Sequence, residues 1–391
     1  MTAHGAAPAA RDALLNRGLS PYSASMTTSP SSDVLLSVLD TAPVWKGSTA
    51  TDSLRNTVRL ARAVDRLGYH RFWLAEHHNM TALSTSSPAV LAGQVAAATR
   101  RLRVGAGGVM LPNHPPLVAA EQFGTLAALH PGRIDLGVGR APGTDPLTAR
   151  ALRRQAGPAG GTDFPAQVKE LLSYFAPPGA DTGRNGSDGR IPTAGPRPVP
   201  AVRAVRAVPA NEHFVPVWVL GSSDYSARLA AVLGLPFAYA HHFSPHGTLA
   251  ALDTYRTRFQ PSPYLSEPYC LVSVFAAVAD DDRRGRQLSE PLRAITAQSL
   301  RGLDPLFPSV EEAAGFELSA EERTVVDALY GAQVFGGPET ARRRIGELVE
   351  TTGADEVMVV SAIQDHDERV RSYELLAQVT GRVPALVAAR A

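Results

Sequence analysis

Residues 71–140 contain three short apolar runs, RFWLAE (71–76), RVGAGGVML (103–111) and RIDLGVGR (133–140), with helix-like segments between them. The segments 87–99 and 115–128 place apolar residues at the three- and four-residue spacing of one helix face. Runs that are apolar throughout predict strands buried on both faces, as in a parallel sheet. This order of strands and helices therefore predicts an α/β fold.

The same alternation continues on both sides of this stretch. Further apolar runs lie at 35–40, 215–221, 236–243, 269–279 and 356–363, and further helical segments at 52–67, 164–175, 223 onward, 246–259, 281–299, 338–351 and 367–380. Eight strands, nearly all followed by a helix, favour a closed (β/α)₈ TIM barrel over an open doubly wound sheet. No G-x-G-x-x-G motif follows the first strand, which argues against a Rossmann fold.

Three stretches do not fit this alternation. Residues 1–33 are rich in Ala, Ser, Thr and Pro, and we expect a disordered N-terminal arm. Residues 156–210 are rich in Gly and Pro, which predicts a long insertion after the fourth strand that could fold over the barrel mouth as a lid. Residues 301–335 are interrupted by Pro and Gly and are expected to be irregular. Residues 34–391 should then form a single barrel domain.

The composition excludes several classes of protein. Thirty-eight Lys and Arg against 37 Asp and Glu give a net charge of +1, so nothing indicates a nucleic acid or a membrane surface as partner. The single cysteine, Cys270, excludes an intrachain disulfide and any site built from several cysteines around zinc or an iron–sulfur cluster. No signal peptide and no 18-residue apolar stretch is found, which predicts a cytoplasmic protein.

Polar residues gather where the predicted strands end, which is where barrel enzymes carry out their chemistry. They are Glu76, His77, His78 and Asn79 after the second strand, Gly107, Gly108, Asn113 and His114 on and after the third, Gly139 and Arg140 on the fourth, Gly221, Ser222 and Ser223 on the fifth, and His241 and His242 on the sixth. A metal site is one alternative, but no two of these ligands have the i, i+4 spacing of metalloproteases, and we expect no metal. A serine hydrolase is disfavoured because no G-x-S-x-G motif is present.

Two of these strand ends suggest a phosphate site. Arg140 ends the fourth strand, and the adjacent fifth strand ends in 221–223, directly before a predicted helix. A helix N-terminus with serine hydroxyls and a nearby arginine suits an anion. The alternatives are a structural salt bridge from Arg140 to Asp135 or Glu121, and an ordinary serine N-cap.

The third predicted strand contains two adjacent glycines, which are unusual inside a strand. Glycine weakens a strand unless something approaches the backbone closely. Gly107 and Gly108 could make room for a flat ring lying against the strand, or for tight packing inside the barrel.

Four segments of the chain resemble the bacterial luciferase-like flavin monooxygenases. They are WLAEHHN (73–79), GGVMLPNHPP (107–116), AEQFGTLAALHPGRIDLGVGRAPG (120–143) and WVLGSSDYSARLAAVLGLPFAYAHHF (218–243). The likeness extends over roughly residues 34–148 and 212–380, and it is closest to single-subunit actinobacterial enzymes, some of them in polyketide tailoring.

The resemblance implies a TIM barrel that receives reduced FMN (FMNH₂) from a separate flavin reductase. The flavin would react with O₂ to a C4a-hydroperoxide, which then oxygenates a small organic substrate, with an aromatic polyketide as our expectation. Such barrels usually form homodimers through the helices that follow the early strands. Two other functions stay open at this point: hydride transfer from the deazaflavin F420 on the same barrel, and a non-catalytic flavin-binding subunit.

The resemblance also implies roles for individual residues. It makes His77 the active-site acid or base, flanked by Glu76 and His78. It assigns to the cofactor Arg140, Gly221, Ser222 and Ser223 at the phosphate, Gly107 and Gly108 at a non-prolyl cis peptide beside the ring, and Asn113 and His241 nearby. Light-emitting luciferases instead have a reactive cysteine at Gly139, a Glu at Gly221 and a Trp at His241, which argues against aldehyde-dependent light emission and suggests a more polar substrate.

Overall fold

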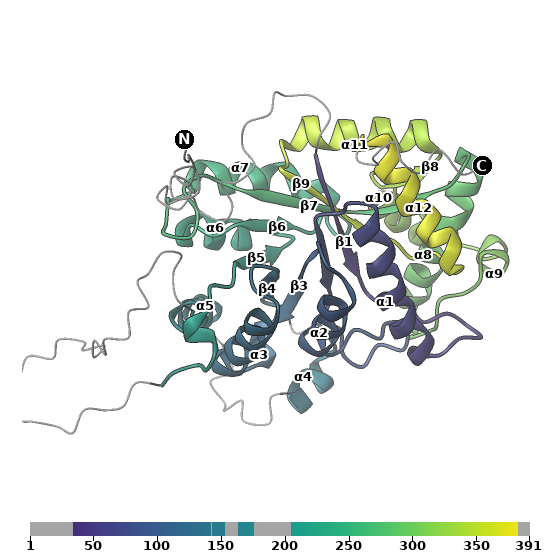
Figure 1. Cartoon of the computed structure of the whole chain (residues 1–391). Helices are drawn as coiled ribbons and strands as arrows, with labels where there is room; N and C mark the ends of the chain where they lie inside the picture. Colours follow the sequence, from purple (N-terminus) through teal and green to yellow (C-terminus); the bar gives the residue numbers. More distant parts are fainter. Residues whose placement is uncertain (1–33, 142, 153–162, 176–204, 382–391) are drawn as a thin grey trace, which may run out of the picture.

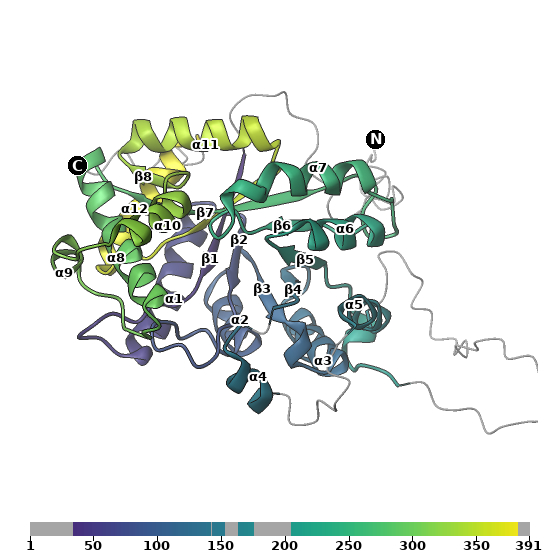
Figure 2. The ribbon, with the colours of Figure 1, turned by 180° about the vertical axis from the view of Figure 1, so that it is seen from behind.

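The computed structural model describes residues 34–141, 143–152, 163–175 and 205–381, and its centre is a closed parallel barrel (Figures 1 and 2). The barrel strands are β1 (Leu35–Asp40), β2 (Arg71–Leu74), β3 (Arg103–Met110), β4 (Ile134–Gly139), β5 (Val217–Gly221), β6 (Phe237–Tyr239), β7 (Cys270–Val278) and β9 (Glu356–Val360). Consecutive strands pair in parallel from β1 to β7, and β9 joins β7 to β1. The predicted TIM barrel is confirmed.

Helices surround this barrel in both views. They are α1 (Ala50–Arg66), α2 (Pro88–Ala98), α3 (Pro116–Leu129), α4 (Pro146–Leu152), α5 (Phe164–Ser173), α6 (Asp224–Leu233), α7 (Thr248–Arg258), α8 (Asp282–Leu300), α9 (Val310–Ala314), α10 (Ala320–Tyr330), α11 (Pro338–Thr352) and α12 (His366–Val379). Short 3₁₀ helices lie at Leu111–Asn113, Ala210–Glu212 and Pro245–Gly247. Helices follow the strands around the ring and cover the outer face of the sheet, so its strands are buried on both faces.

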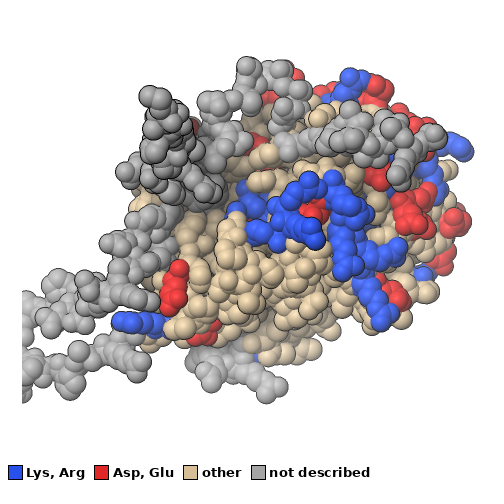
Figure 3. Space-filling view, in the orientation of Figure 1, with Lys and Arg blue, Asp and Glu red and all other residues tan. Residues whose placement is uncertain are grey.

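Helix α1 shows how the sequence forms such an element. Thr49 and Asp52 form a capping box at its start, with Thr49 Oγ1 accepting from the Asp52 N–H at 3.2 Å. Leu60 and Val64 are buried on the inner face, while arginines occupy the outer face. The exposed arginines of α1 are Arg55, Arg59, Arg62 and Arg66. Figure 3 shows basic side chains gathered in a band over this helix, on the outside of the barrel wall.

The expectation of an irregular segment at 301–335 is wrong. This stretch contains α9, α10 and a short strand, β8 (Val334–Gly336), which pairs with β7 outside the ring. Both helices begin with a capping box, Ser309 with Glu312 and Ser319 with Glu322. The S-x-x-E spacing of these boxes is visible in the sequence and outweighs the neighbouring Pro and Gly residues.

Two of the sequence expectations concern residues that the structure does not describe. These residues are the N-terminal arm, 1–33, and most of the insertion, 156–210, so the disordered arm and the lid stay predictions. Within the insertion, α5 agrees with the helix expected at 164–175. Over the described ranges, no helix has the length and apolarity that crossing a membrane requires.

A network of buried ions fills the N-terminal end of the barrel. Arg71, the first residue of β2, contacts Asp135 of β4 at 2.8 Å and Glu356 of β9 at 2.9 Å. Arg103 forms a second ion pair with Asp135. Burial alone would raise the pKa of Asp135, but Arg103 and Arg71 lower it to about 2. Because charged side chains from four strands fill this end of the barrel, space for a ligand is left at the other end.

We expect Arg71→Met to lower the free energy of unfolding by about 3–5 kcal/mol, because it leaves the buried carboxylates of Asp135 and Glu356 without this partner. Urea denaturation monitored by tryptophan fluorescence measures the effect. Arg55→Met, on the exposed face of α1, is the matched control and should change stability by less than about 0.5 kcal/mol. Equal stability of the two variants would contradict the structural role of the network.

Candidate functional site

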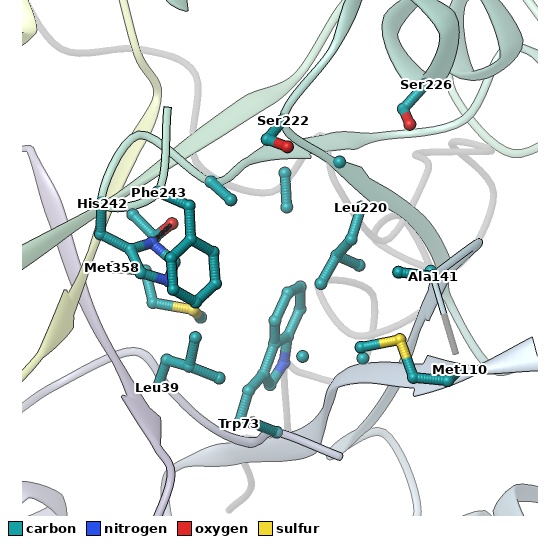
Figure 4. Close-up of a pocket in the computed structure, with 18 of the residues that line it drawn as sticks. Leu39, Trp73, Met110, Ala141, Leu220, Ser222, Ser226, His242, Phe243 and Met358 are labelled. Atoms are coloured by element: carbon teal, nitrogen blue, oxygen red, sulfur yellow. Dashed lines mark hydrogen bonds between the residues drawn. The ribbon is translucent and has the colours of Figure 1, made fainter. Parts of the chain in front are cut away.

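A cavity of about 450 Å³ opens at the C-terminal ends of the barrel strands (Figure 4). Its apolar wall includes Leu39, Trp73, Leu220, Phe243, Leu271 and Met358, and its polar groups include His77, His242, Ser222, Ser223, Ser226 and Ser273. Among the described residues that line it, Arg140 is the only Lys, Arg, Asp or Glu side chain. A concave, mostly apolar space with a few polar groups is typical of a cofactor or substrate site.

The single charge lies at one end of the cavity, beside the start of α6. The Arg140 guanidinium stacks 4.4 Å from the centre of the Tyr225 ring on the first turn of that helix. Ser223 occupies the N-cap position, but its side chain makes no capping hydrogen bond, and Ser222 and Ser223 both line the cavity. The first N–H groups of a helix have no partner within the helix, so this end suits an anion.

The geometry bears on the two structural alternatives for the Arg140 end of the cavity, a salt bridge from Arg140 and a serine N-cap. Asp135, one suggested partner of Arg140, is instead bound by Arg71 and Arg103 at the opposite end of the barrel. The second alternative, an ordinary serine N-cap, is absent at Ser223 within the described structure. The predicted grouping of Arg140 with the end of β5 therefore holds in space.

The glycines of β3 are required by packing inside the barrel. A Cβ on Gly107 would lie 2.9 Å from Cε3 of Trp73, and one on Gly108 would lie 2.7 Å from the carbonyl oxygen of Gly137 on β4. Contacts this short do not occur, so the second of the two explanations offered by the sequence applies. The peptide bond between the two residues is cis, as the resemblance implied, and both residues line the cavity.

His77 faces the cavity from the end of β2. Its backbone N–H donates to the Thr85 carbonyl at 2.8 Å, which holds the residue in place. Its Nδ1 is buried and has no hydrogen-bond partner among the described residues. Burial lowers the pKa of His77 to about 4, partly opposed by Glu76, so the imidazole is neutral near pH 7. Buried nitrogens are usually paired, so this unpaired atom sets His77 apart from the other described residues of the cavity wall.

The histidine pair after β6 is divided between two environments. His242 lines the cavity and bonds to Ser273 Oγ through Nδ1 at 2.7 Å. His241, which the sequence argument placed near the ring, is not among the cavity-lining residues, and its Nδ1 bonds to Thr248 Oγ1 at 2.8 Å. The structure thus places His242, and not the predicted His241, in the cavity wall, because neighbouring residues beyond a strand point in different directions.

Glu76 holds together a polar cluster behind the cavity wall. Its Oε1 accepts hydrogen bonds from His78 Nε2 at 2.9 Å and His114 Nε2 at 2.8 Å, and its Oε2 accepts one from the Met110 N–H at 3.1 Å. Glu76 and His78 do not line the cavity, although Met110 does. Glu76 and His78 were predicted to be catalytic, and this geometry points to a supporting role. Asn113, also predicted at the cofactor, is buried in the 3₁₀ helix at Leu111–Asn113 and is not among the lining residues.

The same cluster has the composition of a metal site. The ligand atoms of Glu76, His78 and His114 lie within 4.8 Å of one another. However, both Nε2–Oε1 distances are hydrogen-bond lengths, and all three groups are engaged with one another. The arrangement therefore fits a carboxylate that orients two imidazoles.

Sequence reasoning missed three polar residues of the cavity, Thr41, Ser226 and Ser273, and it named His242 at a strand end without giving it a role. Ser273 lies inside the predicted strand 269–279, two residues after Leu271, which also lines the cavity. The two-residue period of a strand could have placed it. No comparable signal was available for Ser226, which reaches the cavity from the first turn of α6.

We expect Glu76→Gln to lower the free energy of unfolding by about 1.5–3 kcal/mol near pH 7, because an amide cannot accept all three hydrogen bonds. Burial would raise the pKa of Glu76, but His114 and His78 hold it below its ordinary value. The carboxylate thus contributes stability above its ordinary pKa and loses it in acid, so the difference from wild type should shrink as the pH falls. Urea denaturation at several pH values, with exposed Glu339→Gln as control, measures both effects. A difference that grows in acid would contradict this assignment.

Comparison with known proteins connects this geometry to a family. The model of the family described as luciferase-like monooxygenase matches residues 34–356. Uncharacterized protein YvbT of Bacillus subtilis is 46% identical over 355 residues, which is 90% of this chain and 99% of that protein. A luciferase-like monooxygenase of Escherichia coli K12 is 42% identical over 348 residues, covering 88% of this chain and 97% of the relative.

Solved structures of similar fold include one relative with clear sequence similarity to this chain and two more distant proteins. The crystal structure of apo-MsnO8 has a TM-score of 0.79 at 35% identity and covers 90% of this chain and 99% of its own. Two more distant structures show the same fold. The oxygenating constituent of 3,6-diketocamphane monooxygenase from Pseudomonas putida, in complex with FMN, has a TM-score of 0.61 at 19% identity, with 90% and 98% of the two chains covered. An F420-dependent secondary alcohol dehydrogenase has a TM-score of 0.59 at 13% identity, with 89% and 99% covered. The chain belongs to the luciferase-like monooxygenase family and is an oxidoreductase enzyme.

Proposed function

We propose that the protein is an FMNH₂-dependent monooxygenase that inserts oxygen from O₂ into an organic substrate. The observation that carries the proposal is the polarity of the cavity: one arginine, Arg140, with Ser222 and Ser223 at one end, and uncharged walls elsewhere. A phosphorylated, largely flat and apolar cofactor matches this distribution. The FMN named for the distant 3,6-diketocamphane monooxygenase structure supports the same cofactor.

The two ends of the cavity suit the two ends of FMN. Figure 4 shows Ser222 and Ser226 at the top, His242, Phe243 and Met358 at the left, and Trp73 at the bottom. A phosphate held at Arg140 would direct the isoalloxazine ring toward the apolar walls. The arginine offers charged donors in a planar fork, and the helix start adds backbone N–H groups.

Reduced flavin, when bound, supplies the two electrons needed to activate O₂. The chain's own residues bind it, orient it and keep water away. Leu39, Leu220 and Met358 make the walls apolar, which limits the entry of water. His77 is neutral near pH 7 and can hold or pass a proton at Nδ1, the atom without a protein partner among the described residues. With both cavity histidines neutral, the site suits a neutral organic substrate, of which an aromatic polyketide is one example.

We include two partners in the proposal, a flavin reductase that delivers FMNH₂ and a second copy of the chain. Support for the second copy comes from exposed apolar side chains on the early helices. Val90 on α2 is 71% exposed, and Leu129 at the end of α3 is 68% exposed. A second copy packed against these helices would remove both side chains from water.

Rapid mixing tests the proposed function. Protein with anaerobic FMNH₂ is mixed with oxygenated buffer while the flavin spectrum is recorded. We expect oxidised FMN to appear later than with free FMNH₂, because the apolar walls of the cavity limit contact of the bound flavin with water. Reduced F420 in a parallel experiment tests the alternative, hydride transfer from a deazaflavin, which the F420-dependent fold relative suggests. Oxidation of FMNH₂ at the rate of free flavin, with binding of reduced F420, would replace the proposal by that alternative.

Two variants should separate binding from oxygen chemistry. Arg140→Ala removes the cavity's charged donor and should weaken FMNH₂ binding about ten- to a hundredfold, whereas exposed Arg66→Ala should not change it. His77→Ala should leave FMNH₂ affinity nearly unchanged but shorten the protected interval about tenfold or more. Anaerobic titration measures the first effect and rapid mixing the second. A His77→Ala time course identical to wild type would show that His77 has no role in the oxygen chemistry.

A further inference from the structure

We propose that His242 makes the cavity prefer reduced over oxidised flavin, because it presents to the ligand an imidazole nitrogen that can accept a hydrogen bond but not donate one. This inference rests on the proposed function. It concerns the redox state of the cofactor, which neither the fold nor the phosphate end of the cavity determines.

The hydrogen bonds around Ser273 determine where the imidazole proton lies. Ser273 Oγ donates to the Tyr239 carbonyl at 3.1 Å and lies 2.7 Å from His242 Nδ1. A serine hydroxyl has one hydrogen, and the Tyr239 carbonyl within reach can only accept it. We assign this hydrogen to the carbonyl, and the hydroxyl then accepts from His242, so that Nδ1 carries the proton and Nε2 has the free lone pair.

The imidazole is also neutral. Burial, together with the neighbouring His241 and His77, lowers the pKa of His242 to about 3, against a backbone hydrogen bond at Ser273 that raises it. Near pH 7, no second proton is present on the ring. Nε2 has no protein hydrogen-bond partner among the described residues, and His242 lines the cavity.

Packing keeps the ring in this orientation. The His242 backbone N–H donates to the Ser273 carbonyl at 3.0 Å, so residue and ring are both attached to Ser273. The Phe275 ring meets the imidazole edge-on, with centroids 5.1 Å apart and planes at 89°, and Phe243 lies against it at 4.0 Å. Turning the ring over would break the bond to Ser273 and disturb these contacts.

The two redox states of flavin present different hydrogen-bonding groups. The oxidised isoalloxazine carries a lone pair at N5, whereas reduction places a hydrogen there. An acceptor facing this edge gains a hydrogen bond to the reduced ring and opposes a lone pair on the oxidised ring. Two buried lone pairs facing each other lower the affinity for oxidised flavin. We expect the preference for FMNH₂ to be about tenfold. The enzyme would thus retain FMNH₂ and release FMN.

Three proteins test the inference by anaerobic titration with FMN and with FMNH₂, which gives a ratio of dissociation constants for each. His242→Asn keeps an amide N–H near the Nδ1 position for Ser273 but removes the acceptor at Nε2, and its preference for FMNH₂ should fall about tenfold below that of wild type. The matched control is His241→Asn, since His241 makes the equivalent bond to Thr248 but does not line the cavity, and its ratio should equal wild type.

A second measurement needs neither flavin nor a folded variant. Nitrogen-15 NMR of histidine-labelled wild-type protein reports the tautomer of each imidazole, and His242 should be protonated at Nδ1. Protonation at Nε2 would overturn the inference, as would an unchanged FMNH₂ preference in His242→Asn, and the proposed function would stand in both cases. If wild-type protein binds neither FMN nor FMNH₂, the proposed function fails, and the inference fails with it.

Discussion

The guanidinium of Arg71 lies inside the N-terminal end of the barrel between the carboxylates of Asp135 and Glu356, and it joins three strands of the ring. Buried charges are costly unless they are paired, so these strands must come together in one register for the charges to be compensated. The network also fills this end of the barrel. A ligand can then enter only at the opposite end, where the strands finish in glycine, serine, histidine and arginine.

The cavity above the network depends on how little charge its walls carry. Arg140 is the only charged side chain among its described lining residues, and it lies at the rim, stacked on Tyr225. Deeper in, Trp73, Leu271 and Met358 form an apolar surface. A cofactor with one charged end and one flat apolar end can bind in only one direction in such a space. This polarity supports the proposal that the cofactor is a phosphorylated flavin.

The histidines at the open end of the barrel differ in the hydrogen-bond partners of their side chains. His78 and His114 are both bound to Glu76 and support the wall, whereas His77 keeps a buried nitrogen without a partner among the described residues. His242 is anchored by Ser273, which leaves its other nitrogen toward the cavity. Two neutral imidazoles from β2 and from the end of β6 thus face the same space. Which imidazole nitrogen can meet a ligand therefore depends on the hydrogen bonds that Glu76 and Ser273 make.

The sequence by itself determined the barrel, because eight apolar runs alternating with helical periodicity leave few other folds. It also identified the strand ends that carry Arg140, Ser222 and His77, since parallel strands all finish at one rim. Only the tertiary structure decided that His242 and not His241 faces the cavity, and that Glu76 and His78 lie behind its wall. Those outcomes depend on side-chain directions beyond the ends of the strands and on partners distant in the chain, such as Ser273 and His114, which local periodicity does not encode.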